Sequence, residues 1–241
     1  MPFTFSHPAL VLPLALLPRK WFSLTGLVIG SLTPDFEYFL RMKMRSDHSH
    51  TVGGLLWWDL PLGLLLAFLF HNVVRNTLFN NLPQALHNRF SPYKEFNWNA
   101  YFKMNGPMVL VSIFIGAASH LLWDSFTHEH GYFVKVLPPL AETVGLLGVK
   151  IPAFKILQHA STLLGGLLLT AVVYQLPIHQ ATHHPLRIKY WTWVAVGTFL
   201  MTAFRALGGL EIKMYGHLVA TVIAGFMLSL LITPVFLRQK L

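Results

Sequence analysis

Long apolar segments recur along this chain and constrain its fold more than any other feature. Four of them come close to or exceed the roughly 20 residues that a helix needs to cross a bilayer: residues 51–74, 107–123, 159–176 and 215–237. Residues 191–207 form a fifth, slightly shorter candidate that carries Arg205 near its end. Backbone groups inside lipid must pair with one another, so runs of this length are expected to be helices. The sequence therefore predicts an all-α fold, a polytopic helical membrane bundle with about five long spans.

Two shorter apolar runs precede these spans, at residues 8–17 and 21–33, and a Pro18-Arg19-Lys20 turn separates them. Each run is too short to cross a bilayer comfortably, so we expect a short N-terminal helical hairpin, tilted or re-entrant. The first residues lack the basic region and the small-residue cleavage site of a signal peptide, so we assign the hairpin to the membrane domain. No internal repeat divides the chain, which predicts a single integral membrane domain over residues 1–241.

The charge content excludes a soluble globular protein. Charged residues make up 11% of the chain, against about 25% in soluble domains. The 18 Lys and Arg residues outnumber the 9 Asp and Glu residues, but they stand singly between apolar runs. This pattern indicates contacts with the headgroups of a lipid bilayer, and not with nucleic acid. The chain has no cysteine, so disulfides and thiolate ligands are excluded. Neither composition nor charge predicts an oligomeric state.

The distribution of basic residues predicts an orientation in the membrane. Alternation of the spans brings the loops at residues 36–50 and 125–158 to one side. Of the 18 basic residues, ten then fall on the opposite side and eight on this one. The positive-inside rule makes the opposite side cytoplasmic. The two loops are therefore expected at the extracytoplasmic face.

Histidines and aspartates gather on this same predicted side. The tightest element is His120-x-x-x-Asp124-x-x-x-His128, whose members lie one turn apart on one face of a helix. An imidazole nitrogen and a carboxylate oxygen at this spacing can bind one ion at about 2.0–2.2 Å. The other candidates on this side are Glu37 and the earlier residues His7, Asp35, Asp47, His48 and His50.

These donors predict a divalent metal as cofactor, with zinc first and manganese or iron as alternatives, because no thiolate is present. A pair of metals bridged by carboxylates is a second arrangement. His120 and Asp124 could instead form a plain hydrogen-bonded pair or a helix-packing contact. Asp59 lies about two turns inside its span, where an acid is costly, and could orient a ligand imidazole from behind.

Four short motifs resemble those of membrane-bound metal-dependent hydrolases of bacterial inner membranes: Ser6-His7-Pro8, Leu32-Thr33-Pro34-Asp35, Ser49-His50-Thr51 and Ser119-His120-Leu121-Leu122-Trp123-Asp124. This resemblance implies a bacterial inner (plasma) membrane location, and it implies as metal ligands His7, Asp35, His50, His120 and Asp124. The chain departs from the hydrolase pattern His-Arg-Gly-x-Thr-His-Ser, because it has Asp47-His48-Ser49-His50-Thr51. In the hydrolases a second carboxylate often follows the Pro-Asp by two residues, and here that position is Glu37. Because of these two differences, the resemblance does not decide whether a second metal ion is bound.

Two further resemblances cover different lengths of the chain. The opening Met-Pro-Phe-Thr-Phe-Ser-His-Pro and the run Gly-Ser-Leu-Thr-Pro-Asp-Phe-Glu-Tyr-Phe resemble a bacterial family of multi-spanning proteins, a domain of unknown function, over most of the chain. The His-x-x-x-Asp element is similar to one in zinc-dependent phospholipases C. Those enzymes are helical and cleave phosphodiesters at lipid headgroups.

We therefore predict a membrane-embedded metal-dependent hydrolase that acts on a lipidic or membrane-proximal (phospho)ester, with a metal that activates water. The catalytic candidates for proton transfer are Glu37, Asp47, His48 and His128. The alternative is a non-enzymatic membrane protein, a scaffold or transporter, whose His/Asp cluster is structural. The middle of each span is mostly apolar, which speaks against transport more than against a scaffold.

Overall fold

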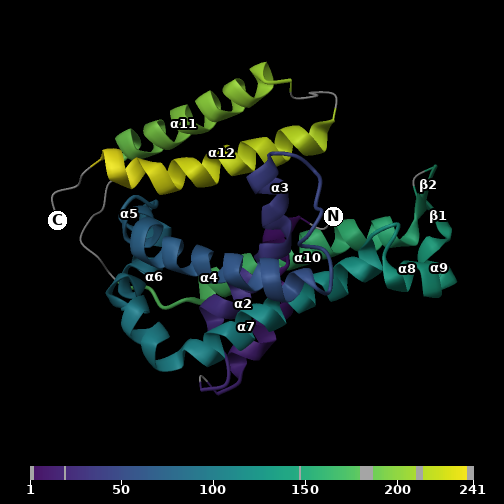
Figure 1. Ribbon diagram of the computed structural model, residues 1–241, viewed down its shortest axis with the longest axis horizontal. Coiled ribbons are helices and arrows are strands. Elements are labelled where there is room, and N and C mark those ends of the chain that lie inside the picture. Colours follow the sequence, from purple (N-terminus) through teal and green to yellow (C-terminus); the bar gives the residue numbers. More distant parts are fainter. Residues whose placement is uncertain (1–2, 19, 147, 180–186, 210–213, 238–241) are drawn as a thin grey trace. The chain divides into compact units, whose positions relative to one another are not determined.

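The computed structural model describes residues 3–18, 20–146, 148–179, 187–209 and 214–237, and this part of the chain is predominantly helical (Figure 1). Four described helical segments are long and apolar enough to cross a membrane: Leu55–Phe79, Trp98–Val136, Ala153–Gln175 and Tyr215–Phe236. The prediction of an all-α, polytopic membrane fold is confirmed. The fifth predicted span is also a helix, α11 (Ile188–Leu207), but it is not among the four.

The N-terminal segment forms the expected short helices. An apolar helical segment runs from Thr4 to Leu16 and consists of η1 (Thr4–Ser6), α1 (Pro8–Val11) and η2 (Leu12–Leu16). Helix α2 (Leu24–Leu32) begins at Ser23, whose hydroxyl oxygen accepts a hydrogen bond from the Gly26 amide and so caps the helix. Helix α1 packs against α2. A 3-10 turn, η3 (Thr33–Asp35), follows α2 directly.

The chain forms two compact units. The first contains Met1–Asp35, His48–Leu64 and Asn105–Gln175, and the second contains Phe36–Asp47, Leu65–Met104 and Leu176–Leu241. Besides the N-terminal helices, the elements that contribute to the first unit are η4 (Leu55–Asp59), α4 (Leu60–Leu69), α7 (Trp98–Thr127), α8 (Tyr132–Val136), α9 (Pro138–Ala141), β1 (Thr143–Leu146), β2 (Val149–Pro152) and α10 (Ala153–Gln175). Helix α7 is kinked at Asn105, two residues before Pro107, because proline cannot continue the hydrogen-bond ladder.

Small residues bring α2 and α7 into backbone contact in the first unit. A Cβ atom at Gly30 would overlap the backbone of Ile113, and one at Gly116 would overlap the backbone of Leu27. Glycine is required for so close an approach, as in other membrane helix pairs. The Ser112 hydroxyl also accepts a hydrogen bond of 2.8 Å from the Ser23 amide. The close approach brings α2 carbonyls within reach of side chains on α7.

Helix α10 packs against the N-terminal residues. The Phe3 amide donates a 3.0 Å hydrogen bond to the Thr162 hydroxyl, and a Cβ atom at Gly165 would lie 2.9 Å from the Ser6 Cβ. Before α10, strands β1 and β2 form an antiparallel hairpin in which Val144 pairs with Ile151. The hairpin lies within residues 125–158, which were predicted to form a loop between spans, so it is an addition to that prediction.

The second unit contains α3 (Phe36–Arg41), η5 (Phe70–Val74), α5 (Arg75–Phe79), α6 (Gln84–Phe90), η6 (Ser91–Glu95), α11 and α12 (Tyr215–Phe236). Helices α11 and α12 lie side by side (Figure 1). The buried Arg75 guanidinium donates to the carbonyl oxygens of Phe96 and Lys94, at 2.7 and 3.0 Å, and holds that segment in place. Trp98 is buried and stacks on His71, with ring centroids 4.6 Å apart.

Candidate metal centre

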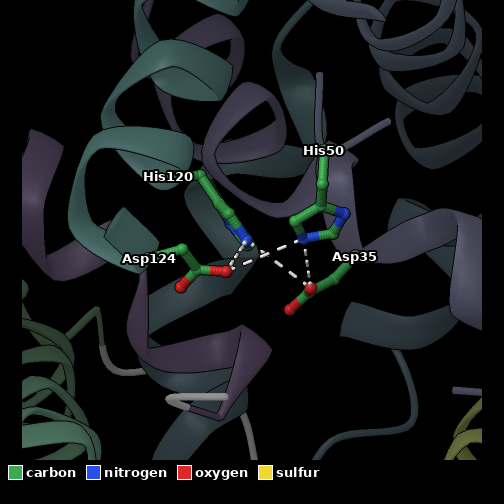
Figure 2. A group of neighbouring side chains, drawn as sticks. All are labelled: Asp35, His50, His120 and Asp124. Carbon is green, nitrogen blue, oxygen red and sulfur yellow. Dashed lines mark ion pairs between the residues drawn. The ribbon is translucent and has the colours of Figure 1, made fainter. Parts of the chain in front are cut away.

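Four side chains from distant parts of the sequence converge in the first unit: Asp35, His50, His120 and Asp124 (Figure 2). One nitrogen or carboxylate oxygen of each lies within 4.8 Å of the corresponding atom of every other. Asp35 and His120 are fully buried, Asp124 is 7% exposed, and His50 is half-buried. A group of this kind could bind a divalent metal ion.

Local structure positions each of the four. His120 and Asp124 stand one turn apart on α7, as their spacing predicts, and Asp35 ends the η3 turn that follows α2. His50 is held by the turn that precedes η4. In that turn the Thr51 hydroxyl donates to the His48 carbonyl oxygen at 2.8 Å and accepts from the Gly54 amide at 2.9 Å.

The atoms of His120 and Asp35 that point away from the centre have hydrogen-bond partners. The His120 Nδ1 lies 2.7 Å from the Ser31 carbonyl oxygen, and a carbonyl can only accept, so Nδ1 carries a proton and Nε2 is the nitrogen that can bind a metal ion. The Thr4 hydroxyl donates to Asp35 Oδ2 at 2.6 Å. These contacts orient His120 Nε2 and Asp35 Oδ1 toward the centre.

The inner atoms, by contrast, lack hydrogen bonds. Among the described residues, His120 Nε2, Asp35 Oδ1 and Asp124 Oδ2 are buried with no hydrogen-bond partner, although buried polar atoms are normally paired. His120 Nε2 lies 3.5 Å from Asp35 Oδ1 and 3.4 Å from Asp124 Oδ2. These separations exceed the usual hydrogen-bond range.

His50 completes the same arrangement. Its Nε2 lies 3.4 Å from Asp35 Oδ1 and 3.7 Å from Asp124 Oδ2. Two ligand atoms bound tetrahedrally at about 2.1 Å from one ion would be about 3.4 Å apart. The four nitrogen–oxygen separations therefore fit two imidazoles and two carboxylates around a single divalent ion.

Two further histidines flank Asp124. The His7 ring stacks on the His120 ring with centroids 3.7 Å apart, and its Nε2 lies 3.6 Å from Asp124 Oδ1. Burial lowers the pKa of His7 to about 3, so its imidazole is neutral. His128 is half-buried, and its Nδ1 lies 3.6 Å from Asp124 Oδ1 and 3.0 Å from the Asp124 carbonyl oxygen.

The other predicted residues lie in different surroundings. Glu37, in the second unit, is buried, and its Oε1 accepts from Arg41 at 2.7 Å and from the Asp47 amide at 2.9 Å. Asp47 pairs with Arg41 at 3.0 Å and with Arg45 at 2.9 Å. The hydrogen bond and charge of Arg45 hold the pKa of Asp47 below its ordinary value.

His48 and Asp59 belong to the first unit. The His48 ring lies against Trp57 and Trp58, with centroids 5.0 and 5.3 Å away. Asp59 is fully buried at the end of η4, a short π-helical segment. Such segments are frequent at functional sites. The predicted role of Asp59 in orienting an imidazole stays a prediction.

Sequence reasoning missed the residues that orient the ligands. Thr4 was not singled out, and Ser31 acts through its backbone carbonyl, which leaves no trace in the side-chain pattern. Ser49, whose hydroxyl lies 3.1 Å from His50 Nδ1, was noted only as part of a motif. A serine immediately before a candidate ligand histidine is the sequence signal that could have identified it.

Comparison with known proteins gives a family and no activity. Residues 1–235 match the family described as a domain of unknown function, DUF4184. No curated protein matches the chain, and no solved structure matches it.

Proposed function

The chain belongs to the DUF4184 family, and we propose that it is a membrane-embedded metal-dependent hydrolase acting on a lipidic or membrane-proximal (phospho)ester. One observation supports this proposal most. Buried donor atoms of two aspartates and a histidine converge without hydrogen bonds, at separations that suit ligands of one ion. An assembly whose only purpose was to join helices would gain by pairing these atoms directly, because unpaired buried polar atoms are costly.

Zinc is the metal that we propose. Two imidazoles and two carboxylates make a borderline donor set, and the separations near 3.4 Å fit tetrahedral ligation. Manganese and iron are the alternatives, and both favour higher coordination numbers with cis ligands closer together. With four protein ligands in place, a bound zinc ion would have to take up water as a fifth ligand. It would then lower the pKa of that water and polarise the scissile oxygen.

His128 is our candidate for proton transfer among the four that the sequence suggests. Its Nδ1 lies 3.6 Å from Asp124 Oδ1 and its ring is half-exposed, so it can exchange protons between the centre and water. Asp47 is engaged with Arg41 and Arg45, which favours its ionised form. Glu37 is engaged with Arg41 and the Asp47 amide.

The rival function is structural. The stacking of His7 on His120 and the contacts of Asp35 with residues of α7 and η1 would join the N-terminal segment to α2 and α7 even without chemistry. In that case substitution of His120 would lower thermal stability and no reaction would be lost with it.

Turnover by the metal-loaded protein tests the proposal. Purified protein is stripped with a chelator, reloaded with zinc, manganese or iron, and offered glycerophospholipids and soluble phosphoesters. We expect metal-dependent hydrolysis, reduced at least 100-fold in Asp124→Asn and less in His128→Ala, which retains the metal. Absence of turnover across the panel by fully loaded wild-type protein would contradict the proposal and favour the structural role.

A further inference from the structure

An apolar cavity lies beside the candidate metal centre in the first unit. Its volume is about 240 Å³, and its walls include Leu10 on α1, Trp123 on α7, and Leu164 and Leu168 on α10. His7 also lines the cavity. We propose that this cavity binds the acyl chain of a lipid ester whose polar end lies at the metal centre. The proposal rests on the hydrolase function proposed above.

The two serine hydroxyls of the cavity wall are already hydrogen-bonded, and His7 is the polar side chain at the end of the cavity toward the metal centre. The Ser6 hydroxyl donates to the Phe3 carbonyl oxygen at 2.7 Å, and the Ser161 hydroxyl donates to the Leu157 carbonyl oxygen at 2.7 Å. Their hydrogens are therefore not available to an occupant. Apolar cavities do not retain water and bind apolar ligands instead. Hydrocarbon is thus the chemistry that this space suits.

The membrane supplies that hydrocarbon directly. Helix α10 is one of the four candidate spans, and only 11% of its apolar stretch is buried within the protein. Leu164 is 64% exposed and Leu168 is 45% exposed, although both line the cavity. In a bilayer these leucines face acyl chains, so a lipid tail can reach the cavity without leaving the hydrocarbon region.

His7 connects the cavity with the metal centre. Its ring lines the cavity on one side and stacks on the ring of His120 at a centroid distance of 3.7 Å. An acyl chain in the cavity would therefore place its polar end within about one imidazole ring of the proposed ligands. This geometry selects amphipathic esters with a long chain over water-soluble phosphoesters.

Photo-crosslinking tests the cavity without reference to turnover. A phosphatidic acid with a diazirine in one acyl chain is added to the detergent-purified full chain at low mole fraction, with and without excess unlabelled lipid. Mass spectrometry locates the adducts. We expect adducts at Leu10, Leu164 and Leu168 that the competitor removes. Leu164→Phe, which enlarges a side chain of the cavity wall, should reduce them at least threefold.

Leu167→Phe is the matched control, because Leu167 is on the same helix, is 58% exposed and does not line the cavity. It should leave the adducts unchanged. Adducts spread evenly over the exposed leucines of α10, or unaffected by competitor and by Leu164→Phe, would overturn the acyl-chain site. The same labelling in a His120→Ala, Asp124→Ala variant separates the two proposals. If both proteins form the specific adducts and wild type hydrolyses no substrate, only the hydrolase proposal is refuted. If wild type hydrolyses a lipid ester but forms no specific adducts, only the acyl-chain site is refuted.

Discussion

At the scale of single residues, the hydrogen bonds behind the candidate ligands matter as much as the ligands. Thr4 lies 31 positions from Asp35 in sequence, yet its hydroxyl donates to Asp35 Oδ2 at 2.6 Å and leaves Oδ1 facing His120. Such partners fix the orientation and the basicity of a ligand. Thr4 therefore belongs to the site as much as a ligand does.

Thr4→Val keeps the shape of the side chain and removes the hydroxyl. We expect it to weaken zinc binding by roughly 10–100-fold, because Asp35 loses the donor that fixes its rotamer. Thr4→Ser should bind like wild type. Competition with a fluorescent zinc chelator measures the affinity, and equal affinity in all three proteins would show that Thr4 does not orient Asp35.

The sequence predicted the candidate ligands better than their surroundings. His120 and Asp124 were found because a four-residue spacing is readable on a helix. Asp35 and His50 were found because they fall on the same predicted side of the membrane, and the resemblance then implied them as ligands. Ser31 contacts His120 through its backbone carbonyl, so this contact depends on how closely α2 approaches α7. No single-sequence pattern reports that distance.

At the scale of elements, that approach is set by glycine. Gly30 and Gly116 let the backbones of α2 and α7 meet, and the Ser31 carbonyl reaches His120 only because they do. The orientation of His120 in the candidate metal centre therefore depends on how closely α2 and α7 pack.

Gly30→Ala tests this dependence. The added Cβ would overlap the backbone of Ile113, so the helices must separate. We expect a loss of about 1–3 kcal/mol in stability, as for other overpacked sites, together with weaker zinc binding. Gly166→Ala on α10 is the control, because its Cβ would meet no atom within 4 Å. Thermal unfolding in detergent compares the stability of the two variants. Equal Tm values for Gly30→Ala and Gly166→Ala would contradict this account.

Most helices followed from hydropathy, and the differences have physical causes. Helix α11 was expected to span, but Lys189, Arg205 and several Trp and Thr residues reduce its apolar character. The β1–β2 hairpin was missed because Thr143–Pro152 is short and contains no alternating run long enough to recognise. The π-helical segments η4 and η5 add residues to a continuous helix, and hydropathy does not distinguish them from α-helix.

At the scale of the whole molecule, the orientation in the membrane is a proposal based on the basic residues. The chain contains no cysteine, so single cysteines can be labelled selectively in intact cells with a membrane-impermeant maleimide. We expect Glu129→Cys, beside the candidate centre in sequence, to react from outside. Glu95→Cys, on the opposite predicted side, should react only after lysis. The reverse pattern would place the centre at the cytoplasmic face.

The central claim is that Asp35, His50, His120 and Asp124 bind a divalent metal ion. Elemental analysis of untagged, detergent-purified protein tests it most directly, with wild type compared with the His120→Ala, Asp124→Ala variant. His159→Ala serves as control, since this exposed histidine lies outside the group. We predict close to one zinc ion per chain in wild type and in the control, and almost none in the double variant. Equal and negligible metal in all three proteins would contradict the claim.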